Sequence, residues 1–250
     1  MNKVIFMAKE TYSSLNALKY LCQKKSMVEI VAAVLRECDK NLLCMCEKHN
    51  IPILTEKQLK EKYKIRELQA DYIFSFYWKK VGKEILTIPT KGSINFHPGP
   101  LPEARGSGYH MAILEDWGYF GVTAHYMDEE FDTGPIIECR RFPIGKNIVN
   151  KDLVRTTHGQ LYKLFIDIVE KIISGDKLEE VKQLDGTYFS LKQLEESKII
   201  DSKASIEEID KKIRAFWNPP YSGAQIEIKG KNYTIINEEI LDWIAKNINI

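Results

Sequence analysis

Short apolar runs alternate with amphipathic stretches along the first half of the chain. The runs lie at residues 3–8, 28–35, 51–54 and 71–76, and helical patterns between them cover residues 12–24 and roughly 40–49. Alternation of strands and helices predicts βαβ units, in which neighbouring strands run parallel and helices cover the sheet. We therefore expect an α/β protein with a mostly parallel sheet.

The second half continues the pattern with more strands and a long helix. Residues 92–97 form a strand-like run, residues 121–128 alternate between apolar and polar, and residues 134–144 are predicted to be the antiparallel partner of that strand. The longest amphipathic pattern covers residues 150–174, and Gly175 follows it directly. Glycine commonly ends a helix, so the helix is expected to stop there.

Composition changes after residue 175, which divides the chain into three predicted parts. Residues 1–175 are expected to form the main N-terminal domain, residues 176–205 a charged, loop-rich linker, and residues 206–250 a small helix and β-hairpin region. The hairpin is predicted to turn at Gly230-Lys231. In the main domain, the stretch SGYHMAILED is predicted to begin a helix with Ser107 as its N-cap.

Charge and composition narrow the functional classes. The 250 residues include 36 Lys and Arg against 35 Asp and Glu, a net charge of +1, so no excess charge indicates a nucleic-acid or membrane partner. No apolar run approaches the ~18 residues of a membrane-spanning helix. Charged residues come too early at the N-terminus for a secretory signal, so we expect a cytoplasmic location.

Cysteines raise the possibility of a zinc site. Five cysteines are an odd number, which fits free thiols in a reducing compartment. Cys38, Cys44, Cys46 and His49 lie close together in sequence. However, residues i and i+2 of a helix point about 200° apart, so Cys44 and Cys46 cannot easily share one metal. We expect no metal and interpret these residues as ordinary helix cysteines.

The segment INFHPGPLPEARGSGYH contains the first candidate for chemistry. Asn95 and His97 are two residues apart in a strand, so both point to the same face at its carboxyl end, where open α/β sheets bind ligands. Pro98 ends the strand immediately. The alternative is a polar strand end with a hydrogen-bonded histidine. No glycine-rich dinucleotide or P-loop motif accompanies the sheet pattern.

A second candidate is Asp132 in the Asp-Thr-Gly segment that follows the strand at 121–128. Aspartic proteases use the same three residues, but they need a pair of aspartates and an all-β fold. Taken alone, Asp132 is more commonly a turn residue than a catalyst. A local turn at Asp132 does not explain why the chain has both this segment and the Asn95–His97 pair.

Three motifs in order resemble a known enzyme family. They are F-x-F-Y (74–77), N-F-H-P-G-P-L-P-x-x-R-G (95–106) and G-V-T-x-H-x-M-D-x-x-x-D-T-G-P-I-I (121–137). Together they resemble the formyltransferases that use 10-formyltetrahydrofolate. The group includes methionyl-tRNA formyltransferase, glycinamide ribonucleotide transformylase and nucleotide-sugar N-formyltransferases. This resemblance implies a Rossmann-like formyltransferase fold in the N-terminal catalytic domain.

The resemblance also implies roles for the candidate residues. Asn95, His97 and Asp132 match the catalytic residues of the family. Asn95 can donate to the oxyanion that forms when an amine attacks the formyl carbonyl. His97 can donate to the same oxygen or handle a proton, while Asp132 orients His97 or accepts the amine proton. Which of His97 and Asp132 is the general base stays open.

The co-substrate 10-formyltetrahydrofolate is expected to bind beside these three residues. By resemblance, the segment after the F-S-F-Y strand and the 127–132 loop form the two walls of its site. The candidate folate-binding residues are Tyr77, Trp78, Lys79, Lys80, Val81 and Asp128. Core packing is the alternative explanation for the aromatic residues at 76–78.

The amine that accepts the formyl group is expected to belong to a nucleotide-linked amino sugar. The tail I-R-A-F-W-N-P-P-Y-S-G-A resembles the corresponding region of nucleotide-sugar N-formyltransferases. By this resemblance, the preferred acceptor is expected to be dTDP-4-amino-4,6-dideoxyglucose, for the synthesis of O-antigen or another surface polysaccharide. A methionyl-tRNA formyltransferase would need a larger, basic C-terminal domain. A glycinamide ribonucleotide transformylase and a non-catalytic nucleotide-sugar-binding protein are also considered.

Several residues are candidates for holding that acceptor. Lys9 and Arg105 would pair with its diphosphate, although each is also typical of a surface charge. Trp217 and Tyr221 would stack on its base or pack the hairpin. The full set of candidate substrate residues is Lys9, Arg105, Gly106, Tyr109, Trp217 and Tyr221. An exposed hairpin has strand edges to cover, so a homodimer is expected.

Overall fold

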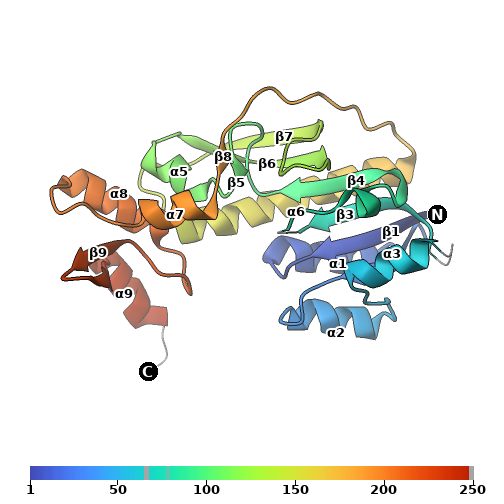
Figure 1. Cartoon of the computed structure of the whole chain (residues 1–250), viewed down its shortest axis with the longest axis horizontal. Coiled ribbons are helices and arrows are strands. Elements are labelled where there is room, and N and C mark those ends of the chain that lie inside the picture. Colours follow the sequence, from blue (N-terminus) through green and yellow to red (C-terminus); the bar gives the residue numbers. More distant parts are fainter. Residues whose placement is uncertain (65–67, 78, 248–250) are drawn as a thin grey trace. The chain divides into compact units, whose positions relative to one another are not determined.

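A six-stranded sheet forms the centre of the fold, as the alternating pattern predicted. The computed structural model describes residues 1–64, 68–77 and 79–247. The strand order is β2-β1-β3-β4-β6-β7 (Figure 1). The strands are β1 (Asn2–Ala8), β2 (Val28–Val34), β3 (Ala70–Phe76), β4 (Pro89–His97), β6 (Tyr119–Tyr126) and β7 (Ile136–Pro143). The expected α/β class is confirmed.

Pairing within the sheet is parallel from β2 through β4 and antiparallel between β4 and β6. The prediction of a strand at 51–54 is wrong, because Ile53 forms only an isolated bridge to Ala33 of β2, the edge strand of the sheet. The Pro52 carbonyl accepts a hydrogen bond from the Ala33 N–H, but proline has no N–H to donate. The pairing with β2 therefore cannot extend into a full strand.

The two faces of the sheet are covered by different helices. On one face, Ile5, Ile73 and Val34 pack against Leu59 of α3 (Glu56–Lys64) and Ile85 of α4 (Lys83–Leu86). These two short helices were not predicted.

On the other face, the Phe165 ring from α6 (Asn150–Ser174) lies among aromatic rings from β3 and β4. Its centroid is 5.8 Å from Phe74, 5.5 Å from Phe76 and 4.9 Å from Phe96. All four rings are nearly or fully buried. Removing such a ring typically costs about 3–5 kcal/mol of folding free energy, so this cluster anchors α6 to the sheet.

Helix ends follow the local sequence signals. α1 (Tyr12–Gln23) begins with a capping box between Thr11 and Ser14. α6 ends where predicted, and Gly175 has a φ of +80°, a conformation that glycine adopts without strain. The remaining helices are α2 (Lys40–Lys48), α5 (Tyr109–Leu114), α7 (Leu191–Ser197), α8 (Ile206–Phe216) and α9 (Glu238–Asn247).

Ser107 is not the N-cap of α5. The N-cap is Gly108, which makes no side-chain capping bond, while the Ser107 N–H donates to the Phe189 carbonyl. Ser107 follows β5 (Arg105–Gly106), the neighbour of β8 (Tyr188–Phe189), and its backbone belongs to that pairing. Long-range strand pairing therefore outweighs the local capping preference.

The C-terminal hairpin exists, but its turn lies one residue earlier than predicted. β9 (Gln225–Ile228) pairs antiparallel with β10 (Lys231–Thr234), which leaves Lys229 and Gly230 as the turn. Both have positive φ, 51° and 77°, as a type I′ turn requires. The helix α9 that follows was not predicted.

The chain forms two compact units that differ from the predicted domains. Unit 1 comprises residues 1–105, 121–141 and 157–187, and unit 2 comprises residues 106–120, 142–156 and 188–250. Each unit has its own apolar interior; in unit 2, Phe120, Leu153, Ile213 and Phe216 are among its buried members. Two internal segments of the predicted N-terminal domain belong to unit 2, so the chain passes between the units more than once.

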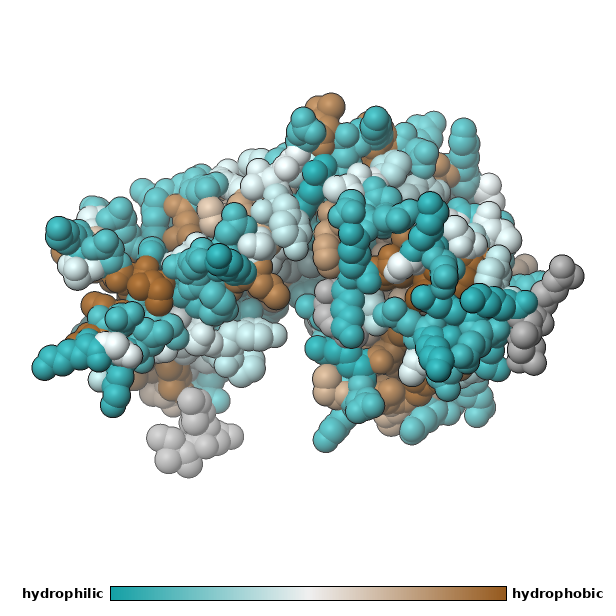
Figure 2. All heavy atoms as spheres, in the orientation of Figure 1, coloured by the Kyte–Doolittle hydropathy of each residue, from teal (hydrophilic) through white to brown (hydrophobic). Residues whose placement is uncertain are grey.

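Hydrophilic side chains cover most of the face shown in Figure 2, with smaller apolar areas between them. Within the described part of the chain, no helix is both long enough and apolar enough to cross a membrane.

Candidate active site

The carboxyl end of β4 carries the first two candidate residues. Asn95 and His97 are 8% and 4% exposed. Asn95 pairs with Ser75 of β3 in the parallel register, so it points to the face of Ile73 and away from the Phe165 cluster. The shared face predicted from the two-residue spacing thus lies at the end of a central strand, inside unit 1.

Asp132 comes to this face from the loop between β6 and β7. Its φ is +56°, which is uncommon for a residue with a side chain. Asp128 supports the loop by accepting hydrogen bonds from the Thr133 hydroxyl and the Glu130 N–H. Gly134 leaves no space for a side chain, since a Cβ there would lie 2.0 Å from the Tyr126 carbonyl oxygen. The loop is therefore tightly built around Asp132.

The structure brings the three candidate catalytic residues together. His97 Nδ1 is 3.4 Å from Asp132 Oδ2, and Asn95 Nδ2 donates to Asp132 Oδ1 at 3.4 Å. The side chains of His97 and Asp132 are 5% and 10% exposed, so this contact is largely shielded from water. An amide, an imidazole and a carboxylate in this arrangement can hold an oxygen and move a proton.

His125 is a fourth member of this cluster that the sequence analysis did not single out. Its Nε2 lies 3.2 Å from Asn95 Nδ2 and 3.6 Å from Asp132 Oδ1. The signal was present: β6 pairs antiparallel with β4, and His125 is the direct partner of Asn95. Opposed residues on neighbouring strands share a face. The alternation at 121–128 predicted the strand, but not its register.

Backbone carbonyls decide which ring nitrogens carry hydrogen. A carbonyl oxygen only accepts, so His97 Nε2–H donates to Ala104 at 2.7 Å, and His125 Nδ1–H donates to Tyr126 at 2.7 Å. The remaining nitrogens, His97 Nδ1 and His125 Nε2, both face Asp132. In the neutral rings these nitrogens are proton acceptors.

The protonation of His97 depends on opposing influences. Burial lowers the pKa of His97, and the neighbouring His125 acts in the same direction. The Asp132 carboxylate and the Ala104 carbonyl oppose that decrease. His97 is therefore largely neutral near pH 7, with Nδ1 ready to take a proton when Asp132 is ionised.

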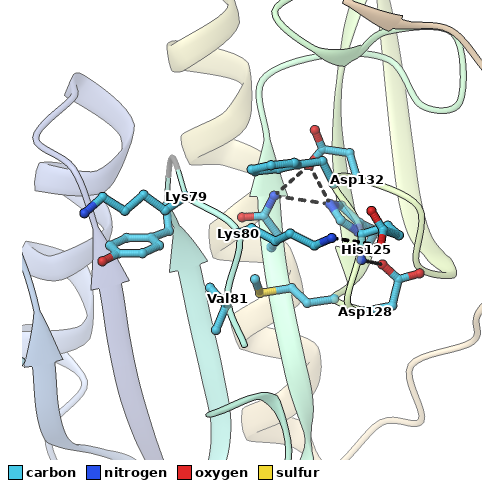
Figure 3. Close-up of a pocket in the computed structure, with 11 residues that line it drawn as sticks. Lys79, Lys80, Val81, His125, Asp128 and Asp132 are labelled. Carbon is cyan, nitrogen blue, oxygen red and sulfur yellow. Dashed lines mark hydrogen bonds and ion pairs between the residues drawn. The ribbon is translucent and has the colours of Figure 1, made fainter. Parts of the chain in front are cut away.

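A pocket opens directly beside these residues (Figure 3). One wall comes from the segment after β3 and the other from the β6–β7 loop. Its lining residues are Tyr77, Lys79, Lys80, Val81, Asn95, His125, Met127, Asp128, Glu130, Phe131 and Asp132. Five of the six candidate folate-binding residues are among them. The sixth, Trp78, lies outside the described residues.

Ion pairs connect the two walls of the pocket. Lys80 Nζ lies 2.8 Å from Glu130 Oε1, and Lys83 Nζ lies 3.1 Å from Glu129 Oε1. Figure 3 shows Lys80 extending toward the loop that carries Asp128, whereas Lys79 points away from it. The Tyr77 hydroxyl donates to Glu56 at 2.8 Å, so this ring is fixed at the side of the pocket.

The candidate acceptor residues of unit 1 are Lys9 and Arg105. Lys9 is half-buried after β1, and burial together with the nearby Arg36 lowers its pKa. Arg105 Nη2 donates to Gln183 Oε1 at 3.1 Å and to the Leu184 carbonyl at 2.9 Å. Its guanidinium therefore takes part in the internal structure of this unit.

The other four acceptor candidates lie in unit 2. Gly106 has a φ of +76° in β5, and Tyr109 stacks on Phe120 with centroids 5.1 Å apart. Trp217 packs edge-on against Trp243 at 6.3 Å, and Tyr221 is 71% exposed. For Trp217 the packing interpretation therefore fits the observed contacts, while Tyr221 has a surface available for a ligand.

The cysteines considered for zinc occupy different environments. Cys46 is buried in α2, whereas Cys38 and Cys44 are exposed. Among the residues described, no group of three or more His, Cys, Asp or Glu side chains is arranged to hold a metal ion.

Comparison with known proteins connects this geometry to a family. The formyl transferase family model matches residues 2–169. A methionyl-tRNA formyltransferase of Wolbachia sp. subsp. Drosophila simulans is 30% identical over 253 aligned positions, covering 95% of this chain and 81% of the relative. A GDP-perosamine N-formyltransferase of Brucella melitensis is 28% identical over 227 positions, covering 88% of this chain and 86% of the relative.

Solved structures agree with this assignment. An N-formyltransferase from Helicobacter canadensis, in complex with folinic acid and dTDP-3-aminofucose, is 27% identical with a TM-score of 0.73, covering 93% of this chain and 86% of the other. A 4-N formyltransferase from Francisella tularensis shares the fold with a TM-score of 0.79 at 20% identity, covering 95% and 97%. With a family match over more than half of its length, this chain belongs to the formyl transferase family.

Proposed function

We propose that the protein transfers the formyl group of 10-formyltetrahydrofolate to the primary amine of a nucleotide-linked amino sugar. The observation that carries this proposal is the meeting of Asn95, His97 and Asp132 beside a pocket. Two relatives support the acceptor class, because one is named for GDP-perosamine and the other was solved with dTDP-3-aminofucose and folinic acid.

The pocket residues fit the pterin end of a folate. A flat ring with polar edges needs apolar walls and nearby hydrogen-bonding groups. Val81, Met127 and Phe131 supply apolar surface, and Asn95 and Asp128 supply polar groups. The residues expected to hold the ring are therefore those at 79–81 and in the 127–132 loop. When bound, 10-formyltetrahydrofolate supplies an electrophilic formyl carbon.

Asn95 is the proposed donor to the formyl oxygen. Its Nδ2 group has two hydrogens, which contact His125 Nε2 at 3.2 Å and Asp132 Oδ1 at 3.4 Å. As the formyl oxygen gains negative charge, it can take the place of Asp132 Oδ1 as the acceptor of the second Asn95 hydrogen. Fixed donors of this kind stabilise developing charge strongly, because they need no reorganisation during the reaction.

His97 and Asp132 are proposed to manage the proton that the amine loses. The carboxylate can accept the proton first, and His97 Nδ1 lies 3.4 Å away to share it. His97 Nε2 is bonded to Ala104, so proton exchange is assigned to Nδ1. Only the uncharged amine has a lone pair for attack, so the rate is expected to rise from mildly acidic to neutral pH.

Within this class, we propose dTDP-4-amino-4,6-dideoxyglucose as the acceptor and surface polysaccharide synthesis as the role. The support is the resemblance of the I-R-A-F-W-N-P-P-Y-S-G-A segment to nucleotide-sugar enzymes. We also propose a homodimer, because both strands of the two-stranded β9–β10 sheet are edge strands and all four residues of β10 are exposed. A cytoplasmic location is proposed as well. A mass of 29.0 kDa by light scattering at micromolar concentration would contradict the dimer.

Methionyl-tRNA is the second candidate acceptor, favoured by the 30% identity to the Wolbachia enzyme. A tRNA-binding segment would be expected to carry excess positive charge to neutralise phosphates. Residues 188–250 contain nine Lys and Arg against ten Asp and Glu, so this segment has no such excess. The charge balance therefore favours the sugar.

The deciding experiment measures tetrahydrofolate release with a panel of acceptors. The panel contains dTDP-, UDP- and GDP-linked amino sugars, glycinamide ribonucleotide and initiator methionyl-tRNA. The folded His97→Asn variant serves as the inactive control, with an expected loss of about 10²–10⁴-fold. If kcat/KM were higher with tRNA or glycinamide ribonucleotide than with every amino sugar of the panel, the sugar assignment would be overturned. If the folded His97→Asn variant released tetrahydrofolate as fast as the wild type, the proposed site would be wrong.

A further inference from the structure

Gln183 is a partly buried residue in an otherwise exposed stretch. It follows α6, in the segment that composition predicted to be a linker, and its neighbours Lys182 and Leu184 are exposed. The backbone beside it is held in place, because Val181 and Ile136 of β7 exchange two hydrogen bonds of 2.8 Å. Residues 181–187 are therefore attached to unit 1.

The side chain of Gln183 joins the catalytic loop to Arg105. Its Nε2 donates to the backbone carbonyl of Asp132 at 3.0 Å and to that of Gly134 at 2.6 Å. Its Oε1 accepts from Arg105 Nη2 at 3.1 Å. A carbonyl can only accept and a guanidinium can only donate, so one orientation of the amide satisfies all three groups.

The same segment is packed closely elsewhere. The Arg105 N–H donates to the Thr187 carbonyl at 3.0 Å, and the Arg105 guanidinium donates to the Leu184 carbonyl at 2.9 Å. A Cβ at Gly186 would lie 2.0 Å from the Pro102 carbonyl oxygen. Arg105 and Gln183 are thus fixed by backbone contacts on both sides.

Asp132 needs such support because of its backbone conformation. A positive φ at a residue with a side chain costs of order 1–3 kcal/mol and persists only when the surroundings hold it. Gln183 bonds the carbonyl of Asp132 itself, on the peptide that follows its strained φ of +56°. A shift of this backbone would move the carboxylate from its place 3.4 Å from both Asn95 and His97.

We propose that Gln183 is a positioning residue: it holds the Asp132 carboxylate against His97 and Asn95, and Arg105 fixes the orientation of its amide. The part of this inference that concerns turnover depends on the proposed function. The part that concerns the position of Asp132 does not.

The test uses Gln183→Glu and Gln183→Ala with Gln193→Ala as the matched control. Glutamate keeps the size of the side chain and the pairing with Arg105, but an ionised carboxylate cannot donate to two carbonyls. Gln193 Oε1 accepts capping hydrogen bonds from the N–H and the hydroxyl of Ser190, the N-cap of α7 in unit 2. The Gln193→Ala variant therefore shows the effect of removing a glutamine side chain that lies close to Gln183 in sequence.

Two measurements separate positioning from a general loss of structure. We expect kcat at pH 7 to fall about 10–100-fold in both Gln183 variants, as small displacements of catalytic groups do. KM for both substrates should stay within about threefold, since Gln183 bonds the Asp132 and Gly134 carbonyls and does not itself line the pocket. Gln193→Ala should leave kcat unchanged.

The second measurement is the titration of the His97 imidazole by NMR, which needs no turnover. Among the residues that the structure describes, the titratable groups that act on His97 are Asp132 and His125, and the charge of Asp132 opposes the lowering of the His97 pKa. A displaced Asp132 should therefore make His97 protonate at a lower pH than in the wild type. An unchanged titration in folded Gln183→Glu and Gln183→Ala would overturn the proposal. If the wild type shows no transfer to any acceptor, the proposed function fails, while this titration still decides the role of Gln183.

Discussion

His97 Nε2 lies 2.7 Å from the backbone carbonyl of Ala104. The contact crosses a loop rich in proline and glycine, and Gly99 lies directly beneath it. A Cβ at Gly99 would be 2.6 Å from His97 Nε2 and 3.0 Å from the Ala104 carbonyl oxygen. The loop therefore closes on the imidazole so tightly that only glycine fits at position 99. This contact gives a physical reason for the glycine at position 99.

Gly99→Ala is expected to lower kcat about tenfold or more, because either His97 or the Ala104 carbonyl must move aside. Gly159→Ala is the matched control, since a Cβ at Gly159 in α6 has no neighbour within 4 Å. The control should keep full activity and gain up to about 1 kcal/mol of helix stability. Activity and thermal unfolding of both variants provide the check. Equal activity in Gly99→Ala and the wild type would show that the loop tolerates the displacement.

Asp132→Asn is expected to reduce kcat about 10²–10⁴-fold while the protein stays folded. An amide has the shape of the carboxylate but cannot accept the amine proton. Its loss also removes the charge that supports a proton on His97, so the pKa of His97 should decrease further. Steady-state rates and the NMR titration of His97 measure the two effects. Near-normal turnover would rule out the proton-accepting role of Asp132.

The sheet was predictable because its strands carry strong local signals. Residues 4–8 and 30–35 are apolar throughout, which is typical of strands in a parallel sheet covered by helices. The positions of Asn95, His97 and Asp132 were also accessible, because the motifs fix their order and strand alternation fixes the face. Sequence did not reveal α9 in advance, although EEILDWIAKN has an amphipathic pattern.

His125 and Gln183 show why the rest of the site was not predicted. His125 reaches Asn95 only through the antiparallel register of β4 and β6, which no local pattern determines. Gln183 is 51 residues from Asp132 and lies in a polar, irregular segment. Its contacts depend on where the chain returns after α6. Such contacts arise from tertiary structure, so residue type and periodicity carry no signal of them.

His125→Phe is expected to lower kcat/KM about 10–100-fold. The ring would still fill the space, but Asn95 Nδ2 would lose its acceptor at 3.2 Å. A buried donor without a partner typically costs about 1–3 kcal/mol and turns toward another acceptor, which here is Asp132. His125→Gln, whose side-chain oxygen can accept, should recover part of the activity. The same rate in all three proteins would mean that His125 does not orient Asn95.

Folding stability is expected to decrease between pH 6.5 and pH 4, partly because of His110. This histidine of α5 is 2% exposed and packs on Phe216 with ring centroids 5.5 Å apart. Its Nε2 is buried and, within the described residues, has no hydrogen-bond partner. Burial and the nearby Lys198 lower the pKa of His110 to about 4.

The direction of the effect follows from proton binding. Below pH 6.5 the unfolded chain protonates this histidine while the folded protein keeps it neutral, so the unfolded state binds more protons and is favoured as pH falls. The loss attributable to His110 is about 2 kcal/mol at pH 5 relative to pH 8. His110→Phe should remove this part of the pH dependence, because the ring that replaces it packs on Phe216 without a charge to bury.

Urea unfolding followed by tryptophan fluorescence at pH 5 and pH 8 measures the difference, and Trp117, Trp217 and Trp243 lie in the same unit as His110. Parallel stability curves for the wild type and His110→Phe over this pH range would show that His110 is not the group responsible.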